Sequence, residues 1–338
     1  MRKHLLLFLS ISVLVLLVFF GIQRTVFSET TAQLSGCADF AYSTEEDFIT
    51  QGPTPPDGVS YISDGDLLGA NHTVCMRNRD LLSVFDVPED LGLDAVDVID
   101  VEKELVAFST ELNDPAKRFT EGDLLTTWGA VIPNQVLLTL FQVQGDRGLD
   151  AVHFVGDIQN ILAFHDAITS ITRDEWLKDP GALSNLLTEY EVELWFSIEG
   201  TELSAATVSI LDGDLLSAQG TIKLSNADLL PASVPAGLPS RGVDFGLDAF
   251  SAERSLDTLE GVFSTEILYQ DKTSFTDGDV ILVGNGVDTP DVDLYTPFEP
   301  LADFLGTDAL HQSAVPPQPT FFDIYLPLVQ RFIQQLFP

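Results

Sequence analysis

The stretch Gly122-Asp123-Leu124-Leu125, followed by Asn134 and then by Gly148-Leu149-Asp150-Ala151-Val152, decides the fold of this chain because it recurs. Four copies place their Gly-Asp pair at residues 65–66, 122–123, 213–214 and 278–279. The Leu-Asp-Ala step recurs at residues 93–95, 149–151 and 247–249, and as Thr-Asp-Ala at residues 307–309. An aromatic-Ser element, typically Phe-Ser-Thr-Glu, recurs at residues 42–45, 108–111, 196–199 and 263–266. Such internal repetition indicates a fold that is built from equivalent units.

Each element of the unit has the pattern of a short strand or a strand end. The residues from Val106 to Glu111 alternate in the period of a half-buried strand. The Gly-Asp pair suits a turn or bulge before an apolar strand, because Gly tolerates positive φ and Asp bonds its own backbone. The Asn-x-x-Leu-Leu-x-x-Phe segment that begins at Asn134 predicts a strand that ends in a turn of helix.

Four strand-like elements per unit predict a mainly β fold, a four-unit β-repeat domain arranged as a four-bladed β-propeller. The first unit begins with the aromatic-Ser element, and the last ends with the Thr-Asp-Ala variant of the Leu-Asp-Ala step. This offset predicts that the two ends of the domain complete one shared blade. A β-sandwich or an open stack of β-repeats is the alternative that the same strands allow.

The domain organisation follows from changes of pattern along the chain. We predict a β-repeat domain at residues 38–310, with units at about 38–97, 104–153, 192–250 and 260–310. Helical spacing of apolar residues predicts a helical insertion at about 157–190. Residues 311–320 contain three prolines and are predicted to be a linker. The apolar segment 321–338 is predicted to pack on the domain or to bind a membrane or a partner.

The N-terminus and the charge indicate where the protein acts. Arg2 and Lys3 precede an apolar run from Leu5 to Ile22, so residues 1–24 are predicted to be a signal peptide or an N-terminal membrane anchor, followed by a linker at 25–37. We therefore expect an extracytoplasmic protein that is either anchored in the membrane at the cell surface or secreted. The 52 acidic residues against 16 basic ones give a net charge of −36, which excludes a nucleic-acid-binding role.

The chain has two cysteines, Cys37 and Cys75. An even count in an oxidising compartment favours a disulfide between them. The string Leu34-Ser35-Gly36-Cys37 also matches a bacterial lipoprotein processing box, in which Cys37 is lipidated. The distance of this box from the apolar run argues against lipidation, and free thiols are a third alternative.

Aspartates recur at fixed places in the units, so each unit is a candidate calcium site. The candidate ligands are the aspartates of the Gly-Asp pairs and two that precede them, Asp64, Asp66, Asp123, Asp214, Asp277 and Asp279. A second set recurs at the Leu-Asp-Ala steps, Asp94, Asp150, Asp248 and Asp308. The interpretation that we favour is that each aspartate accepts backbone hydrogen bonds and holds its own turn, so that the protein needs no cofactor, and calcium binding is the alternative.

The order of Phe-Ser-x-Glu, Gly-Asp-Leu-Leu, Asn-x-x-Leu-Leu-x-x-Phe and Gly-Leu-Asp-Ala over about residues 38–310 resembles that of uncharacterised exported bacterial repeat proteins. The fourth unit departs from it, with Val280-Ile281 for the paired leucines and Gly306-Thr307 for Gly-Leu. The resemblance implies export and carries no known activity. No common catalytic motif occurs in the sequence. We expect a non-enzymatic binding or structural module with a protein or carbohydrate ligand at the cell surface. The alternative is an extracellular hydrolase on a calcium-stabilised propeller that uses His153 or His165.

Overall fold

The computed structural model describes residues 34–313, except residues 71, 204–208, 239–240, 256–258 and 272. The predicted leader at 1–24, most of the linker at 311–320 and the apolar segment 321–338 lie outside the described residues. Within the part that is described, no helix has the length and apolarity that crossing a membrane requires.

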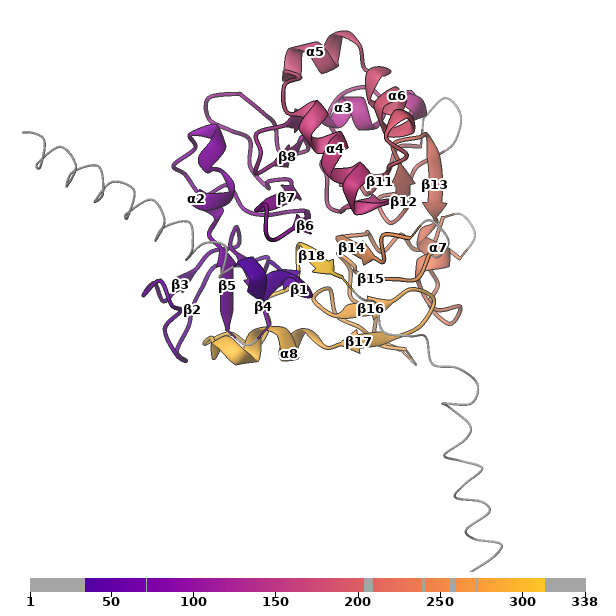
Figure 1. Ribbon diagram of the computed structural model, residues 1–338. Helices are drawn as coiled ribbons and strands as arrows, with labels where there is room; N and C mark the ends of the chain where they lie inside the picture. Colours follow the sequence, from indigo (N-terminus) through magenta and orange to yellow (C-terminus); the bar gives the residue numbers. More distant parts are fainter. Residues whose placement is uncertain are drawn as a thin grey trace, which may run out of the picture.

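The fold is mainly β, as predicted, with five antiparallel sheets of four or fewer strands (Figure 1). The first sheet consists of β18 (Leu310–Gln312), β1 (Phe40–Tyr42), β4 (Leu67–Gly69) and β5 (Thr73–Met76). The second consists of β6 (Val96–Asp100), β7 (Leu105–Phe108), β8 (Leu124–Thr126) and β9 (Val131–Ile132). The third consists of β10 (Val152–Val155), β11 (Glu193–Phe196), β12 (Leu215–Ser217) and β13 (Thr221–Leu224). The fourth consists of β14 (Ala249–Ala252), β15 (Gly261–Ser264), β16 (Val280–Leu282) and β17 (Val287–Thr289), and a small fifth sheet pairs β2 (Phe48–Ile49) with β3 (Tyr61–Ile62).

One strand of each four-stranded sheet faces the centre of the molecule. These inner strands contact one another in a cycle, β6 with β10, β10 with β14, β14 with β18, and β18 with β6. The four large sheets are therefore arranged around a common centre, and none of them closes on itself into a barrel.

The two ends of the described chain meet in the first sheet. Strand β18 pairs with β1, so that Leu310 lies opposite Tyr42, and in Figure 1 the yellow C-terminal strand lies beside the indigo strand β1. This is the pairing that the offset of the repeated elements predicts. Strand β18 runs to Gln312, so His311 belongs to the sheet and not to the linker that was predicted to begin at residue 311.

The inner strands of the large sheets are buried on both faces, because each sheet packs against two neighbours, whereas the outer strands β13 and β17 are partly exposed. In β7, Val106 belongs to the hydrophobic core between the first and second sheets, and Ala107 belongs to the core between the second and third. All four residues of β7 are buried. The expectation of a half-buried strand was therefore wrong here, since the small side chains of the alternating pattern face a second core and not solvent.

A short α-helix follows the outer strand of each large sheet, where the sequence predicts a helical turn. These helices are α2 (Asn78–Leu81), α3 (Asn134–Leu137), α7 (Asn226–Leu229) and α8 (Asp291–Tyr295). Single 3-10 turns lie at η1 (Ser35–Cys37), η2 (Ser83–Phe85), η3 (Thr139–Phe141) and η4 (Thr296–Phe298).

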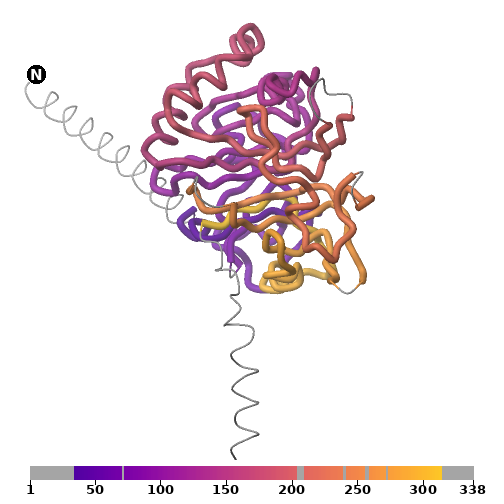
Figure 2. Tube along the Cα trace, turned by 90° about the vertical axis from the view of Figure 1, so that its right-hand side faces the viewer, coloured from indigo at the N-terminus to yellow at the C-terminus, as the bar shows by residue number. Residues whose placement is uncertain are grey.

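Three helices, α4 (Ile158–Ile168), α5 (Arg173–Lys178) and α6 (Ala182–Glu189), lie between β10 and β11. The Asp157 carboxylate accepts the N–H of Gln159 and begins α4, and Thr172 forms a capping box that begins α5. Helix α5 contacts α3 and β9, and α6 contacts β11. The insertion therefore covers the second and third sheets at one end of the molecule (Figures 1 and 2).

The predicted disulfide is confirmed, since Cys37 is bonded to Cys75 across 38 residues of chain. It ties η1 to the outer strand β5, and both cysteines are buried.

Removal of this disulfide is expected to lower the free energy of unfolding by about 2 to 4 kcal/mol, because the bond restricts the unfolded chain. Urea denaturation of the Cys37→Ala/Cys75→Ala protein measures the loss. An equal stability of the double variant and the parent protein would contradict this prediction.

Candidate metal centre

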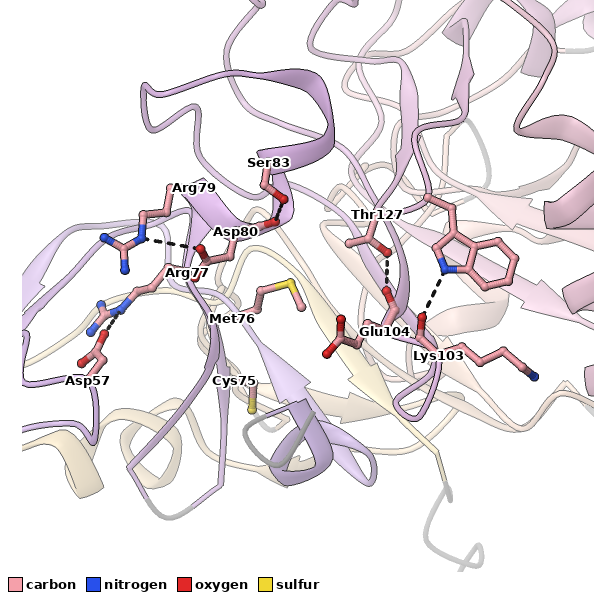
Figure 3. A pocket seen from close by; sticks show the side chains of 11 residues that line it. Asp57, Cys75, Met76, Arg77, Arg79, Asp80, Ser83, Lys103, Glu104 and Thr127 are labelled. Atoms are coloured by element: carbon pink, nitrogen blue, oxygen red, sulfur yellow. Dashed lines mark hydrogen bonds and ion pairs between the residues drawn. The ribbon is translucent and has the colours of Figure 1, made fainter. Parts of the chain in front are cut away.

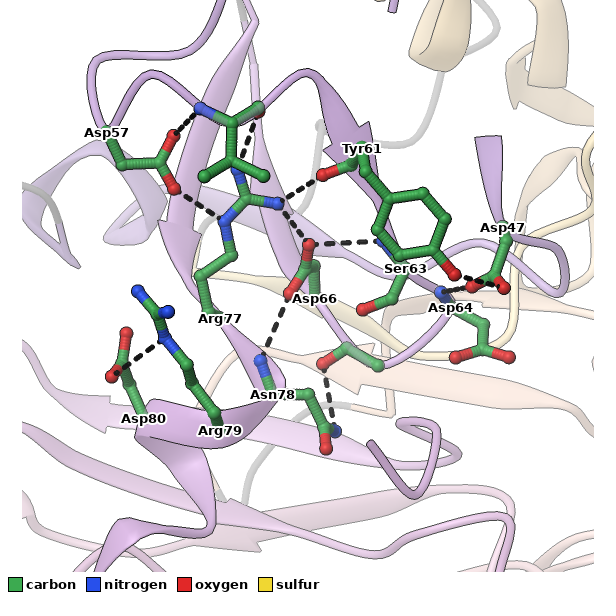
Figure 4. A network of polar contacts seen from close by, with 12 residues as sticks. Asp47, Asp57, Tyr61, Ser63, Asp64, Asp66, Arg77, Asn78, Arg79 and Asp80 are labelled. Carbon is green, nitrogen blue, oxygen red and sulfur yellow. Dashed lines mark hydrogen bonds and ion pairs between the residues drawn. The ribbon is translucent and has the colours of Figure 1, made fainter. Parts of the chain in front are cut away.

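The aspartates of the four Gly-Asp pairs bind their own turns. Asp66 accepts the backbone N–H groups of Ser63 and Asn78, each at 3.1 Å. The equivalent pairs of donors are Thr120 and Asn134 for Asp123, Leu211 and Asn226 for Asp214, and Thr276 and Asp291 for Asp279. Two of the four carboxylates also bind a guanidinium group, Asp66 that of Arg77 (Figure 4) and Asp123 that of Arg173. These aspartates therefore hold their own turns, which is the structural alternative to calcium binding.

The six predicted calcium ligands are not brought together. Asp64 and Asp66 belong to the first sheet, Asp123 to the second, Asp214 to the third, and Asp277 with Asp279 to the fourth. Asp64 lies beside Asp47, whose carboxylate accepts its N–H at 3.1 Å (Figure 4).

The asparagine that follows the outer strand connects the Gly-Asp turn to the Gly-Leu-Asp-Ala segment. In the second sheet the N–H of Asn134 binds Asp123, while its side chain accepts from the N–H of Arg147 at 2.8 Å and donates to the carbonyl of Gly148 at 2.6 Å. This chain of hydrogen bonds sets the position of Asp150, two residues after Gly148.

Asn78 of the first unit makes the same two side-chain contacts, with the N–H of Leu91 and the carbonyl of Gly92. Asn226 of the third unit accepts from the N–H of Phe245 at 3.4 Å, but its amide donates to the carbonyl of Gly213.

The fourth unit replaces this asparagine with Asp291, which has no amide donor. The hydroxyl of Thr307 donates to the Gly278 carbonyl at 2.9 Å instead, where Asn78 and Asn226 reach the equivalent carbonyls of their units. The change from Gly-Leu to Gly306-Thr307 therefore compensates for the loss of the amide.

Eight carboxyl groups converge in one cavity of about 570 Å³, which we call the carboxylate cavity. Each large sheet supplies one aspartate just before its inner strand and one glutamate just after the next strand. The pairs are Asp308 with Glu45, Asp94 with Glu111, Asp150 with Glu199, and Asp248 with Glu266. The aspartates come from the Leu-Asp-Ala steps, and the glutamates end the aromatic-Ser elements.

Several oxygens in the carboxylate cavity have no hydrogen-bond partner although they are buried. They include both carboxylate oxygens of Asp150, Oδ2 of Asp94 and Oε1 of Glu111. Asp150 is only 3% exposed and Asp94 only 7%. The three residues Asp94, Asp150 and Glu199 are the only group of potential metal ligands among the described residues whose ligand atoms lie within 4.8 Å of one another.

Burial perturbs the acidity of the whole cavity. It raises the pKa of all four aspartates well above the usual value, and the charges of neighbouring carboxylates raise it further. The same two causes raise the pKa of Glu45 and of Glu111 to about 7. Carboxyl groups in this state need a proton or a cation to be stable in the folded protein.

The glycine of each Gly-Leu-Asp-Ala segment makes room for the cavity glutamate. Gly148 has a φ of +72°, and a Cβ atom there would lie 2.6 Å from Cγ of Glu199. Gly92, Gly246 and Gly306 lie against Glu111, Glu266 and Glu45 in the same way. The glycine is therefore required both by its backbone conformation and by the side chain beside it.

Gly148→Ala is expected to lower the free energy of unfolding by about 2 to 3 kcal/mol and to displace Glu199. Gly58→Ala is the matched control, because Gly58 has a φ of +79° but no atom within 4 Å of the added Cβ. The control is expected to lose only about 1 kcal/mol. Urea denaturation compares the two, and equal losses would contradict the contact with Glu199.

A second polar cluster lies on the inner strands, away from the carboxylate cavity. Asp97, His153 and His311 stand three residues after the cavity aspartates of their strands. Asp97 is fully buried and forms an ion pair with Arg254 at 2.7 Å, while Nδ1 of His311 lies 3.2 Å from its carboxylate. Burial would raise the pKa of Asp97, but the charge of Arg254 and the hydrogen bond with His311 hold it well below its usual value. Burial lowers the pKa of His153 to about 3, so this imidazole is neutral.

The two histidines that were considered as catalytic groups, His153 and His165, lie outside the carboxylate cavity. His153 lies in β10 near Asp97, with 3.7 Å between Nδ1 and Oδ2. His165 lies in α4, stacked edge-on against Phe154 and Phe164. Burial lowers the pKa of His165 to about 3. Neither histidine lines the carboxylate cavity.

Another cavity, of about 400 Å³, lies between β5 with α2 and the turns that precede β7 and β9 (Figure 3). Its lining includes three cations and three carboxylates, Arg77, Arg79, Lys103, Asp57, Asp80 and Glu104. Arg77 binds Asp57 at 2.7 Å, and the Trp128 indole donates to the Lys103 carbonyl at 3.2 Å. Because the charges balance, this cavity has no net electrostatic preference for an ion.

Comparisons of the chain with protein-family models, with curated proteins and with solved structures find no match. The function is therefore argued from the site itself. The predicted calcium ligands do not include the four cavity glutamates. The signal that identifies them is the carboxylate that ends the aromatic-Ser element in all four units.

Proposed function

We propose that this chain is a four-bladed β-propeller whose carboxylate cavity binds calcium, and that it serves as an exported binding or structural module. The cycle of contacts among β6, β10, β14 and β18 supports the propeller, as does the completion of the first sheet by the last strand. The apolar N-terminal run and the Cys37–Cys75 disulfide support export to an oxidising compartment.

The observation that carries the calcium proposal is Asp150. Both of its carboxylate oxygens are buried without a hydrogen-bond partner, in a cavity that seven other carboxyl groups also line. A buried carboxylate in this position is costly unless a cation or a proton compensates it. The proposed calcium therefore lies at the Leu-Asp-Ala aspartates and the aromatic-Ser glutamates, and not at the Gly-Asp turns.

The donor set favours calcium over other common metals. The cavity is lined only by carboxylates, which are hard oxygen ligands, and no histidine or cysteine lines it. Zinc and copper sites use nitrogen or sulfur ligands. Calcium accepts six to eight oxygens in a flexible arrangement, whereas magnesium requires a compact octahedron and retains its waters. A wide cavity of eight carboxylates matches calcium better.

The hydrolase alternative needs a histidine together with the repeated carboxylates in one polar pocket. The carboxylates do converge, but His153 and His165 are buried elsewhere with pKa values lowered to about 3. A binding or structural role therefore agrees better with this site than a hydrolytic one. The proposed membrane attachment through residues 1–24 and a protein or carbohydrate ligand at the cell surface rest on the sequence.

Calorimetric titration of the chelator-treated protein with calcium tests the proposal. Asp150→Asn is expected to weaken binding at least about tenfold, which corresponds to about 1.4 kcal/mol, because it removes a ligand charge. Asp174→Asn is the matched control, since Asp174 is exposed on α5 and its charge lies outside the cavity. The absence of calcium binding by the parent protein, or equal affinities for the parent protein and Asp150→Asn, would refute the proposal.

A further inference from the structure

We infer that a single calcium ion lies to one side of the carboxylate cavity, at Asp94, Asp150 and Glu199, and that it joins the second sheet to the third. This inference rests on the proposed calcium binding, and it assigns the ligands of the ion and its place in the fold.

The three carboxyl groups are close enough together to share one ion. One ligand atom from each of Asp94, Asp150 and Glu199 lies within 4.8 Å of the others. Calcium binds oxygens at about 2.3 to 2.6 Å, so two oxygens on the same ion lie at most about 5 Å apart. The other five carboxyl groups of the cavity belong to no such group among the residues that the structure describes. The distances therefore favour an ion at this place over an ion at the centre of the cavity, which all four sheets would hold.

Buried oxygens without a partner distinguish two of the four cavity aspartates from the others. Both carboxylate oxygens of Asp150 and Oδ2 of Asp94 lack a hydrogen-bond partner. Asp248, by contrast, accepts the Ser264 hydroxyl at 3.1 Å. No oxygen of Asp248 or Asp308 is buried without a partner. The oxygens that need a cation therefore lie on the two aspartates that form a group with Glu199.

The serine of the aromatic-Ser element explains why these two aspartates stay free. In the fourth sheet this serine binds the cavity aspartate of its own sheet. In the second sheet Ser109 donates instead to the Leu149 carbonyl at 2.6 Å, and in the third sheet the Ser197 hydroxyl has no partner. Neither Asp94 nor Asp150 therefore receives the hydroxyl of its own sheet. The Ser109 contact also fixes the backbone immediately before Asp150.

The three ligands come from both sides of one interface between sheets. Asp94 precedes β6 in the second sheet, whereas Asp150 precedes β10 and Glu199 follows β11 in the third. The inner strands β6 and β10 contact each other. Asp94 and Asp150 are buried and Glu199 is exposed, so an ion enters past Glu199, and the waters that complete its six to eight oxygens lie on that side. The bound ion thus holds these two sheets together.

Calorimetric titration of the chelator-treated full chain with calcium tests this assignment through two matched pairs of variants. The parent protein is expected to bind one ion. Glu199→Gln is expected to weaken binding at least about tenfold because it removes a ligand charge, whereas Glu45→Gln removes only a neighbouring charge and should weaken it less than about threefold. Asp94→Asn and Asp248→Asn form the second pair, with the same expected difference. Melting in the presence of chelator checks that all four variants fold, and the exposed Glu199 is replaced without any change in the core.

The outcomes separate this inference from the proposed function. Equal losses of affinity within either pair would overturn the assignment and leave calcium binding intact, because the ion would then be held by the whole ring of carboxylates. Two or more ions per parent chain would overturn the single site. A parent protein that binds no calcium would refute the proposed function itself.

Discussion

Without calcium, the free energy of unfolding is expected to fall as the pH rises from about 6.5 to 8.5, and saturating calcium is expected to reduce this loss. The pKa values of Glu45 and Glu111 are raised from 4.5 to about 7 in the folded protein, so the folded state retains protons that the unfolded chain has already released. The stability linked to these protons is fully present below about pH 4.5 and is lost as the pH rises through about 7.

The buried histidines do not disturb this pH window. The pKa values of His153 and His165 are lowered to about 3 in the folded protein, whereas the usual value in the unfolded chain is about 6.5. The folded protein therefore loses stability through these histidines only when the pH falls below about 6.5, where the unfolded chain begins to bind protons. Above that pH, both histidines are neutral in both states. Asp212 and Asp291 lie outside the carboxylate cavity, and burial raises their pKa values to about 8 and about 7. They lose their protons in the same window, so calcium is expected to remove only the part of the loss that comes from the cavity.

Calcium at about a thousand times its dissociation constant would add about 4 kcal/mol to the free energy of unfolding. Urea denaturation at both pH values, with calcium or with a chelator, measures this gain. Asp150→Asn is expected to be more stable than the parent protein at the higher pH without calcium, because it lacks a buried charge, and to gain less from calcium. A calcium-free stability that rises with pH, or an equal calcium gain in Asp150→Asn, would contradict the expectation.

Arg254→Met is expected to lower the free energy of unfolding by about 3 to 5 kcal/mol, because it leaves the charge of Asp97 buried without its main partner. Asp97 is fully buried and receives two hydrogen bonds from the Arg254 guanidinium, at 2.7 and 2.9 Å. The guanidinium also donates to the carbonyls of Phe154 and Val98. One side chain thus connects the segment just after β14 to two inner strands, β6 and β10.

Arg79→Met is the matched control for this variant. The Arg79 side chain is 67% exposed, and its ion pair with Asp80 is 3.6 Å long, so its loss is expected to change stability by less than about 0.5 kcal/mol. Asp97→Asn combined with Arg254→Met should recover part of the loss, since the combination removes the unpaired charge. Urea denaturation measures the free energy of unfolding of all three proteins. Equal losses in Arg254→Met and Arg79→Met would show that the buried ion pair of Arg254 with Asp97 does not stabilise the fold.

The sequence by itself determined the local structure of the repeated unit. Gly-Asp pairs, the Asn that begins α2, α3 and α7, and the alternating strands are local signals, because turn geometry and backbone hydrogen bonds depend on residues close in the chain. The offset of the elements also predicted the pairing of β18 with β1. An even count of two cysteines, in a chain that was predicted to be exported, predicted the disulfide.

Only the tertiary structure decided which carboxylates form a site. Asp150 and Glu199 belong to one sheet and Asp94 to its neighbour, so they meet only because the inner strands contact one another in a cycle. The same arrangement separates the Gly-Asp aspartates, which stay bound to their own turns. A repeat places each residue type once per unit, but whether equivalent positions converge or diverge depends on how the units pack around the centre. For this reason the sequence revealed the turns, and the packing of the sheets created the carboxylate cavity.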